Sequence, residues 1–92
     1  MKIEFDPNKS RKNAIERDLP FDLVGNFLWE TATTIPDTRY EYPEARFVST
    51  GFVENRLHVV CYTPVNEGIR VISFRKANSR EIDQYVKKTT NR

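Results

Sequence analysis

The sequence predicts an α+β fold in a single domain over residues 1–92, with two helices first, then an antiparallel sheet of about four strands, and a closing helix. Three observations predict this order. Apolar residues recur at helical spacing before residue 29, β-branched segments with short breaks fill residues 31–75, and a capping pair opens the last amphipathic segment. A chain of 92 residues has the size of one small domain with a thin core.

The amino-terminal part predicts a brief extended segment at residues 2–5 followed by two helices. Asp6 can cap the free amides of a first helix over Pro7–Arg17, and Pro7 suits its first position. A second helix is predicted from Pro20 to Leu28. Its apolar residues recur at helical spacing: Phe21, Val24, Phe27 and Leu28.

After Trp29 the pattern changes to that of strands. Four segments are rich in β-branched or alternating residues: Thr31–Ile35, Glu44–Val53, Arg56–Thr63 and Ile69–Arg75. Glu54-Asn55 suits a two-residue hairpin turn, and Pro64–Gly68 is predicted as a loop. Because these connections are too short for crossovers, we expect neighbouring strands to run antiparallel.

A capping signature opens the last helix. The Asn78 side chain can cap the helix, and Glu81 stands three positions later as its reciprocal partner. Ile82, Tyr85 and Val86 then form a one-sided stripe, which predicts packing on the sheet and fraying over Lys87–Arg92.

Composition excludes several classes of protein. The chain is 38% hydrophobic and 30% charged, too apolar for disorder and too interrupted by charge for a membrane span. The start carries no secretion signal, so we expect a cytoplasmic protein. His58 and Cys61 are the only residues of their kinds and lie in one predicted strand, so we expect structural roles for both, no metal site and no cofactor.

The strand after Gly68 carries two arginines in a segment without acidic residues. Alternation places Ile69, Val71, Ser73 and Arg75 on one face of the strand, and Arg70, Ile72 and Phe74 on the other. An arginine held on a strand presents a planar fork of donors that matches a phosphate. The alternative is an ion pair with a carboxylate at the sheet edge, and the segment alone leaves both interpretations open.

A second pair of charged residues suggests chemistry on RNA. Glu44 and Arg46 share a predicted strand face, so adjacent strands could bring them beside Ser73 and Arg75. Attack by a ribose 2′-hydroxyl needs the phosphate to be held and neutralised and a proton to be moved, which arginines and a carboxylate can do. A plain cross-strand ion pair, worth roughly 0.2–1 kcal/mol, is the alternative.

Tyr40 and Tyr42 lie in the charged, proline-bounded stretch before Glu44, where we expect their rings to be the most exposed aromatic groups. Exposed rings can stack on bases of single-stranded RNA. Packing over a sheet edge is the other interpretation of this pair.

The order of these motifs resembles the BrnT toxin family, ribonuclease toxins of bacterial type II toxin-antitoxin modules. The resemblance covers nearly the whole chain, in these pieces: Phe5-Asp6-Pro7-Asn8-Lys9 with Asn13, the segment Phe21–Phe27, Asp37, Glu44-x-Arg46 with Gly51, Arg56-Leu57, and Arg70-x-Ile72-Ser73-x-Arg75-x-Ala77 with Arg80-Glu81 and Tyr85. It implies a RelE-like fold, metal-independent cleavage of RNA and arrest of translation. It also implies neutralisation by a BrnA-like antitoxin, and hence a hetero-oligomer.

The resemblance assigns candidate roles to residues. Catalytic candidates are Glu44, Arg46, Ser73 and Arg75, and RNA-binding candidates are Arg70, Lys76, Arg80 and Tyr85. We expect Arg46 and Arg75 to hold the scissile phosphate and Glu44 to transfer the proton.

The chain departs from the family at the end of helix 1. Many members carry Lys-His-Gly where Glu16-Arg17-Asp18 stands here, so any role of that histidine is absent or altered. Two other interpretations follow. The chain could be a catalytically weakened module that binds RNA or protein, or its basic face could mainly receive an acidic antitoxin segment.

Overall fold

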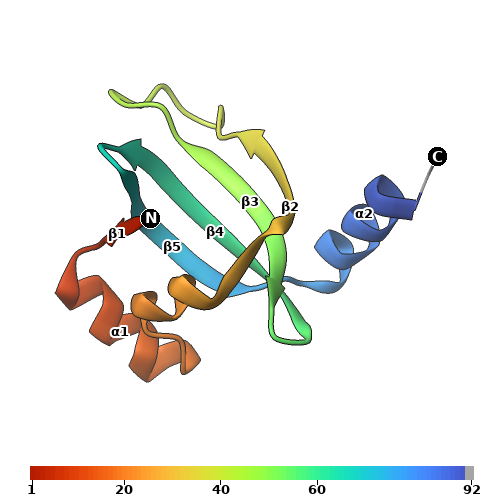
Figure 1. Ribbon diagram of the computed structural model, residues 1–92, viewed down its shortest axis with the longest axis horizontal. Helices are drawn as coiled ribbons and strands as arrows, with labels where there is room; N and C mark the ends of the chain where they lie inside the picture. Colours follow the sequence, from red (N-terminus) through yellow and green to blue (C-terminus); the bar gives the residue numbers. More distant parts are fainter. Residues whose placement is uncertain (91–92) are drawn as a thin grey trace.

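Five strands form one mixed sheet, in the order β1-β5-β4-β3-β2, in the computed structural model, which describes residues 1–90. Figure 1 shows α1 beside β5 and α2 at the opposite side of the sheet. The elements in chain order are β1 (Lys2–Glu4), α1 (Pro7–Arg17), the 3₁₀ helix η1 (Phe21–Asn26), β2 (Phe27–Pro36), β3 (Phe47–Val53), β4 (Arg56–Val65), β5 (Gly68–Lys76) and α2 (Ser79–Thr90).

The predicted α+β class is confirmed, and the four predicted strands pair antiparallel as β2 to β5, but the predicted strand number is wrong by one. The extended start is a fifth strand, and β1 runs parallel to β5, with Lys2 opposite Gly68. Gly68 permits this approach, since a Cβ there would lie 1.8 Å from the backbone oxygen of Lys2. No local pattern encodes a pairing between the two ends of the chain, so the sequence did not predict it.

The α-helix predicted over Pro20–Leu28 is also wrong. Phe21–Asn26 is a 3₁₀ helix, and the backbone is already extended at Phe27, with φ −68° and ψ 129°. Phe21, Val24 and Phe27 are all buried. Their spacing of three matches the three residues per turn of a 3₁₀ helix. The apolar pattern therefore predicted correctly which residues are buried, but it did not predict the type of helix.

The predicted first helix, Pro7–Arg17, is confirmed with both bounds, and Asp6 accepts a hydrogen bond from the Asn8 amide. The strands after it are shifted from their predicted bounds. β3 begins at Phe47, so Glu44 and Arg46 precede it in a loop. Between β4 and β5 only residues 66 and 67 form the turn, and Glu67 has φ 65°.

A bulge in β5 overturns the predicted faces of that strand. Cys61 of β4 pairs with Ser73 and Tyr62 pairs with Val71, which leaves Ile72 without an opposite residue. The extra residue reverses the alternation. Arg70 therefore lies on the same face as Ser73 and Arg75, whereas Phe74 joins Ile69 and Val71 in the core.

The two faces of the sheet carry separate apolar clusters. The larger cluster packs η1 against β4 and β5, with Val24, Val60 and Phe74 at most 1% exposed. The smaller cluster joins Leu57, Val59 and Tyr85 beneath α2. Because of the bulge, both Arg70 and Arg75 of β5 lie on the face of the sheet that α2 partly covers.

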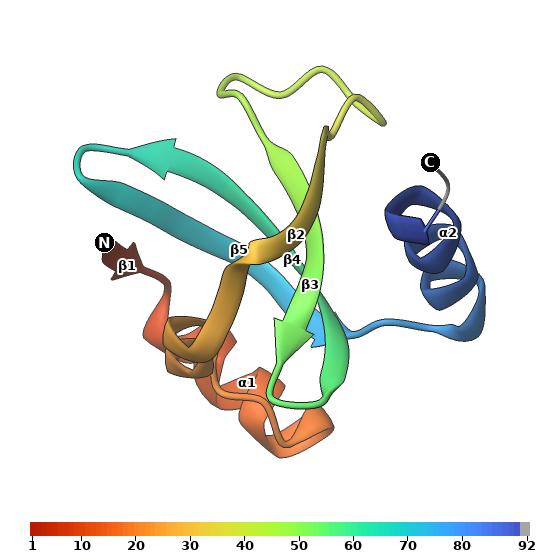
Figure 2. The same ribbon diagram turned by 45° about the vertical axis from the view of Figure 1, so that its right-hand side comes forward.

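The capping pair of α2 is confirmed, because the Asn78 and Glu81 side chains each accept from the other's backbone N–H at 2.9 Å. The helix runs to Thr90 instead of fraying from Lys87, and Arg92 lies outside the described residues. Tyr85 is buried, but Val86 remains 47% exposed. Figure 2 shows α2 extending away from the sheet after a short link to β5, which agrees with this limited packing.

Candidate functional site

A cleft between the start of α1, β5 and the end of the 37–46 loop holds the residues that most resemble a phosphate site. This Arg46 cleft is lined by the charged residues Asp6, Lys9, Glu44, Arg46 and Arg70, together with Thr63, Val71 and Ile72. Arg70 points here because Thr63, its partner on β4, shares its face of the sheet. The fold thus brings α1, the 37–46 loop and β5 together at one surface.

A second cleft adjoins the first on the other side of Ile72. This Arg75 cleft is lined by the polar residues Lys9, Lys12, Asn13, Glu16, Arg17, Ser73 and Arg75, with Phe21, Ile72 and Phe74. Lys9 and Ile72 line both clefts. The predicted convergence of Glu44 and Arg46 with Ser73 and Arg75 is therefore replaced by two neighbouring clefts, because Glu44 and Arg46 meet β5 at residues 70–72 and not at Arg75.

Arg46 is held from two sides at the mouth of its cleft. Its Nε donates to Glu44 Oε1 at 2.7 Å, and its Cζ lies 3.8 Å from the centroid of the Tyr42 ring. The hydrogen bond to Glu44 raises the pKa of Arg46 above its usual value. This guanidinium is consequently a fixed positive charge with a defined orientation.

Arg75 and Arg70 also pair with carboxylates. Both terminal nitrogens of Arg75 bond to Glu81, at 2.7 and 2.8 Å, and Arg70 Nη2 lies 3.2 Å from Glu4 Oε1. The bond to Glu81 raises the pKa of Arg75, and the same bond lowers the pKa of Glu81. All three arginines of the two motifs thus form ion pairs with carboxylates, as the alternative for Arg70 and Arg75 predicted. The Glu44–Arg46 pair, however, lies within one loop and is not the predicted cross-strand pair.

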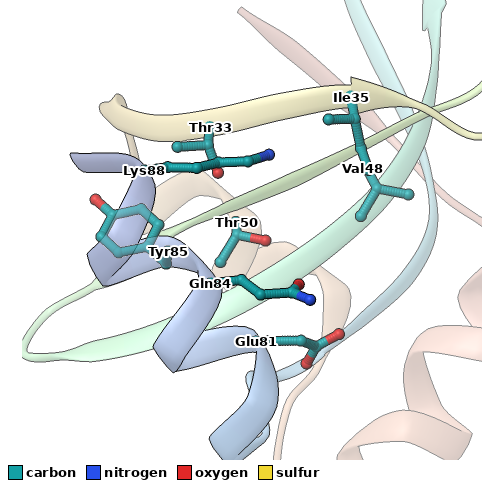
Figure 3. Close-up of a pocket in the computed structure, with 8 residues that line it drawn as sticks. All are labelled: Thr33, Ile35, Val48, Thr50, Glu81, Gln84, Tyr85 and Lys88. Atoms are coloured by element: carbon teal, nitrogen blue, oxygen red, sulfur yellow. The ribbon is translucent and has the colours of Figure 1, made fainter. Parts of the chain in front are cut away.

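The remaining candidates lie outside both clefts. Lys76 and Arg80 are exposed at the end of β5 and the start of α2. The Tyr85 hydroxyl donates to the backbone oxygen of Thr31 at 2.5 Å, and its ring packs on Phe52. Figure 3 shows Tyr85 at the groove between α2 and the sheet, beside Gln84 and Lys88.

Sequence reasoning missed the basic residues of α1. Lys9 and Lys12 stand three positions apart and face β5 together with Arg17. Neither Lys9 nor Arg17 forms an ion pair with any of residues 1–90. The signal available was this helical spacing of cations, but only the tertiary fold shows that these exposed side chains line a cleft beside β5.

Asn13 fixes α1 at the edge of β5. Its side-chain amide donates to the backbone oxygens of Leu19 and Phe74, at 2.7 and 2.8 Å. Asp18, which follows α1, has φ 58°, a left-handed conformation. Glycine, which many members of the resembling family carry at this position, adopts that conformation readily.

The two residues expected to be structural are buried. The His58 ring stacks on Phe74 and its Nδ1 lies 2.9 Å from the Arg56 backbone oxygen, while burial lowers its pKa. Burial likewise raises the pKa of Cys61, whose Sγ lies 3.7 Å from Asp37. A neutral thiol of this kind is a poor nucleophile.

Over residues 1–90, no group of three or more His, Cys, Asp or Glu side chains is placed to hold a metal ion. None of the helices in this range is both long enough and apolar enough to cross a membrane.

Comparison with known proteins places the chain in a family. A search of curated proteins gave no match. The family model for the ribonuclease toxin BrnT, of type II toxin-antitoxin systems, matches residues 5–81, which include both clefts and their arginines. The chain therefore belongs to the BrnT family of ribonuclease toxins.

Proposed function

We propose that this chain is the toxin of a type II toxin-antitoxin module and acts in the cytoplasm as an endoribonuclease that cleaves RNA without a metal ion and so arrests translation. A BrnA-like antitoxin is the proposed neutralising partner. The observation that carries the proposal is that Lys9, Arg46 and Arg70 converge on one cleft with the carboxylate of Glu44. Cations hold and neutralise a phosphodiester, and a carboxylate can accept a proton beside it.

The proposed reaction is attack of a ribose 2′-hydroxyl on the neighbouring phosphate. The 2′-oxygen bonds to phosphorus as its proton passes to a base, the bond to the 5′-oxygen breaks, and that oxygen takes up a proton. The products are a 2′,3′-cyclic phosphate and a 5′-hydroxyl end. The protein must therefore supply a base and positive charge near the phosphate oxygens, while the 5′-oxygen takes its proton from water in the open cleft.

Glu44 is the proposed base. Its Oε1 accepts from Arg46, while its Oε2 has no hydrogen-bond partner within residues 1–90. Its side chain is 40% exposed, so a ribose hydroxyl can reach it. The proton taken from the 2′-oxygen would pass to Oε2, and Arg46 would keep the carboxylate oriented.

Arg46 is the proposed phosphate ligand. Only its Nε is used by Glu44, and its two terminal nitrogens make no hydrogen bond within residues 1–90. Those nitrogens can bind the phosphate oxygens as a fork. Arg70 and Lys9 line the same cleft and would offset the negative charge that grows in the transition state.

Arg75 and Ser73 are proposed to hold the next phosphate of the chain, in the Arg75 cleft. Lys12 and Arg17 add positive charge there. Lys76 and Arg80 extend the attraction for RNA at longer range, and Tyr85 positions α2. Because the two clefts meet at Ile72, one RNA strand can occupy both.

The test is inducible expression in bacteria of the parent chain and of Arg46→Ala and Arg75→Ala. We expect the parent to arrest growth and both variants to lose most of this effect. Arg11→Ala is the matched control, since Arg11 is exposed on α1 and lines neither cleft. If both variants are soluble, folded and as toxic as the parent, the assignment of these arginines is wrong.

A second candidate function is a binding module without cleavage, favoured by the ion pairs that already occupy Arg46 and Arg75. Incubating the purified chain with RNA, with and without a chelator, separates the two. Cleavage that survives the chelator supports the metal-independent enzyme, and cleavage abolished by it contradicts that mechanism. Salt-sensitive RNA binding with no cleavage supports the binding module.

A further inference from the structure

We propose that the ring of Tyr40 is a stacking site for an unpaired base of single-stranded RNA. The proposal rests on the proposed function, to which it adds a contact with the base. Tyr40 lies in the 37–46 loop and is 72% exposed, an unusual exposure for a large aromatic side chain. The loop leads directly into the Arg46 cleft.

The exposed ring is backed by two other side chains. Tyr40 and Tyr42 meet edge to face, with centroids 5.9 Å apart and planes at 79°. The Arg46 guanidinium carbon lies 3.8 Å from the Tyr42 centroid. These three residues form a continuous unit, here called the Tyr40 stack, in which a cation orients one ring and that ring supports the next.

The loop that carries the stack is fixed at both ends. The Asp37 amide donates to the Arg46 backbone oxygen at 2.8 Å, and the Thr63 hydroxyl donates to that of Ala45 at 2.6 Å. The Asp37 carboxylate is held by two side-chain nitrogens of Arg39, both at 2.9 Å. A braced loop loses little conformational entropy when a ligand binds, so its ring is suited to recognition.

Arg46 links the stack to the phosphate site, which favours RNA as the ligand. The same guanidinium contacts the Tyr42 ring and lines the cleft that contains Arg70. A nucleotide could therefore place its base on Tyr40 and its phosphate near Arg46. Aromatic rings beside a cationic groove are the usual means by which proteins bind single strands without fixed sequence. An acidic segment would use the cations alone, whereas a nucleotide can use the cations through its phosphate and the bare ring through its base.

The test uses a short single-stranded RNA containing 2-aminopurine, whose fluorescence changes on stacking. We expect Tyr40→Ala to weaken binding by about fivefold or more and to abolish the fluorescence change. Tyr40→Phe should retain both, because it keeps the aromatic face. Thr38→Ala, an exposed change in the same loop, should behave like the parent. The dependence of affinity on salt should not alter, since the phosphate contacts remain.

Three results would overturn the proposal. If Tyr40→Ala binds the RNA and changes its fluorescence as the parent does, Tyr40 is not a stacking site, although the proposed function stands. If Tyr40→Ala weakens only the complex with a co-purified antitoxin, the ring belongs to a protein interface. If the parent binds no RNA, this proposal and the proposed function fail together. Tyr40→Leu, which keeps apolar bulk, serves if the alanine variant does not fold, and it should also lose the fluorescence change.

Discussion

Arg75 and Glu81 form a two-point ion pair that joins β5 to α2, with both nitrogen–oxygen distances between 2.7 and 2.8 Å. Glu81 Oε1 also accepts from the Asn78 amide, so one carboxylate closes the helix cap and fills the fork of the arginine. A carboxylate in this geometry occupies the donors that a phosphate would use. Binding of RNA at Arg75 therefore competes with the attachment of α2.

This competition predicts that Glu81→Gln strengthens RNA binding. Glutamine still completes the capping pair but no longer neutralises Arg75. We expect the dissociation constant for single-stranded RNA to fall by about two- to fivefold, because RNA no longer has to displace one partly exposed ion pair. Fluorescence anisotropy at fixed salt measures it.

The control for Glu81→Gln separates release of Arg75 from a general change in charge. The double variant Arg75→Ala/Glu81→Gln should show no gain over Arg75→Ala alone. An equal gain in both backgrounds would show that Arg75 is not the group released.

Asn13→Ala should destabilise the fold by roughly 1–3 kcal/mol, because the backbone oxygens of Leu19 and Phe74 each lose their side-chain donor. Urea unfolding measures the change. Lys12→Ala, at an exposed position of the same helix, should shift the free energy of unfolding by less than about 0.5 kcal/mol. Equal stability of the two variants would show that Asn13 does not hold α1 to β5.

Gly68→Ala should detach β1 from the sheet. The added Cβ would meet the backbone oxygen of Lys2 at 1.8 Å, so the strand must move, at a cost of roughly 1–3 kcal/mol. Hydrogen exchange at the amides of residues 2–4 should become fast. Gly25→Ala is the matched control, since its Cβ would meet only Ile3 Cδ1, at 3.9 Å. Unchanged protection of β1 in Gly68→Ala would contradict the observed parallel pairing.

Asp37→Asn should lose stability in a way that depends on pH. Hydrogen bonds from Arg39 lower the pKa of Asp37 from 3.8 to about 2 in the folded state. Its contribution is therefore complete above pH 3.8 and is lost as the pH falls through about 2. The difference in unfolding free energy between parent and variant should be largest near neutral pH and shrink between these values. A difference that stays constant down to pH 2 would argue against ionised Asp37 as its source.

Much of the fold followed from local sequence signals. Asp6-Pro7 opens α1, Asn78 and Glu81 cap α2, and the turn at Glu54-Asn55 joins β3 to β4. Each of these features depends on residues within a few positions of one another. Local capping and turn chemistry can therefore be predicted without knowing the rest of the structure.

The candidate site was predicted only in part. The sequence indicated Glu44 and Arg46 as one pair and Ser73 and Arg75 as another, and both pairs line clefts. It could not show that the two pairs line separate clefts, nor that Lys9 lines both of them. These relations depend on how α1 and the 37–46 loop pack beside β5, which joins residues far apart in the chain.

The sequence by itself determined the class of fold, the capped helices and the motifs that place the chain in the BrnT family. Tertiary structure decided the face on which each arginine lies. One unpaired residue, Ile72, reverses the alternation of β5 and turns Arg70 toward the side of Arg75. Because a strand alternates with a period of two, a single extra residue changes the side of every residue beyond it, and only the pairing with β4 reveals that residue.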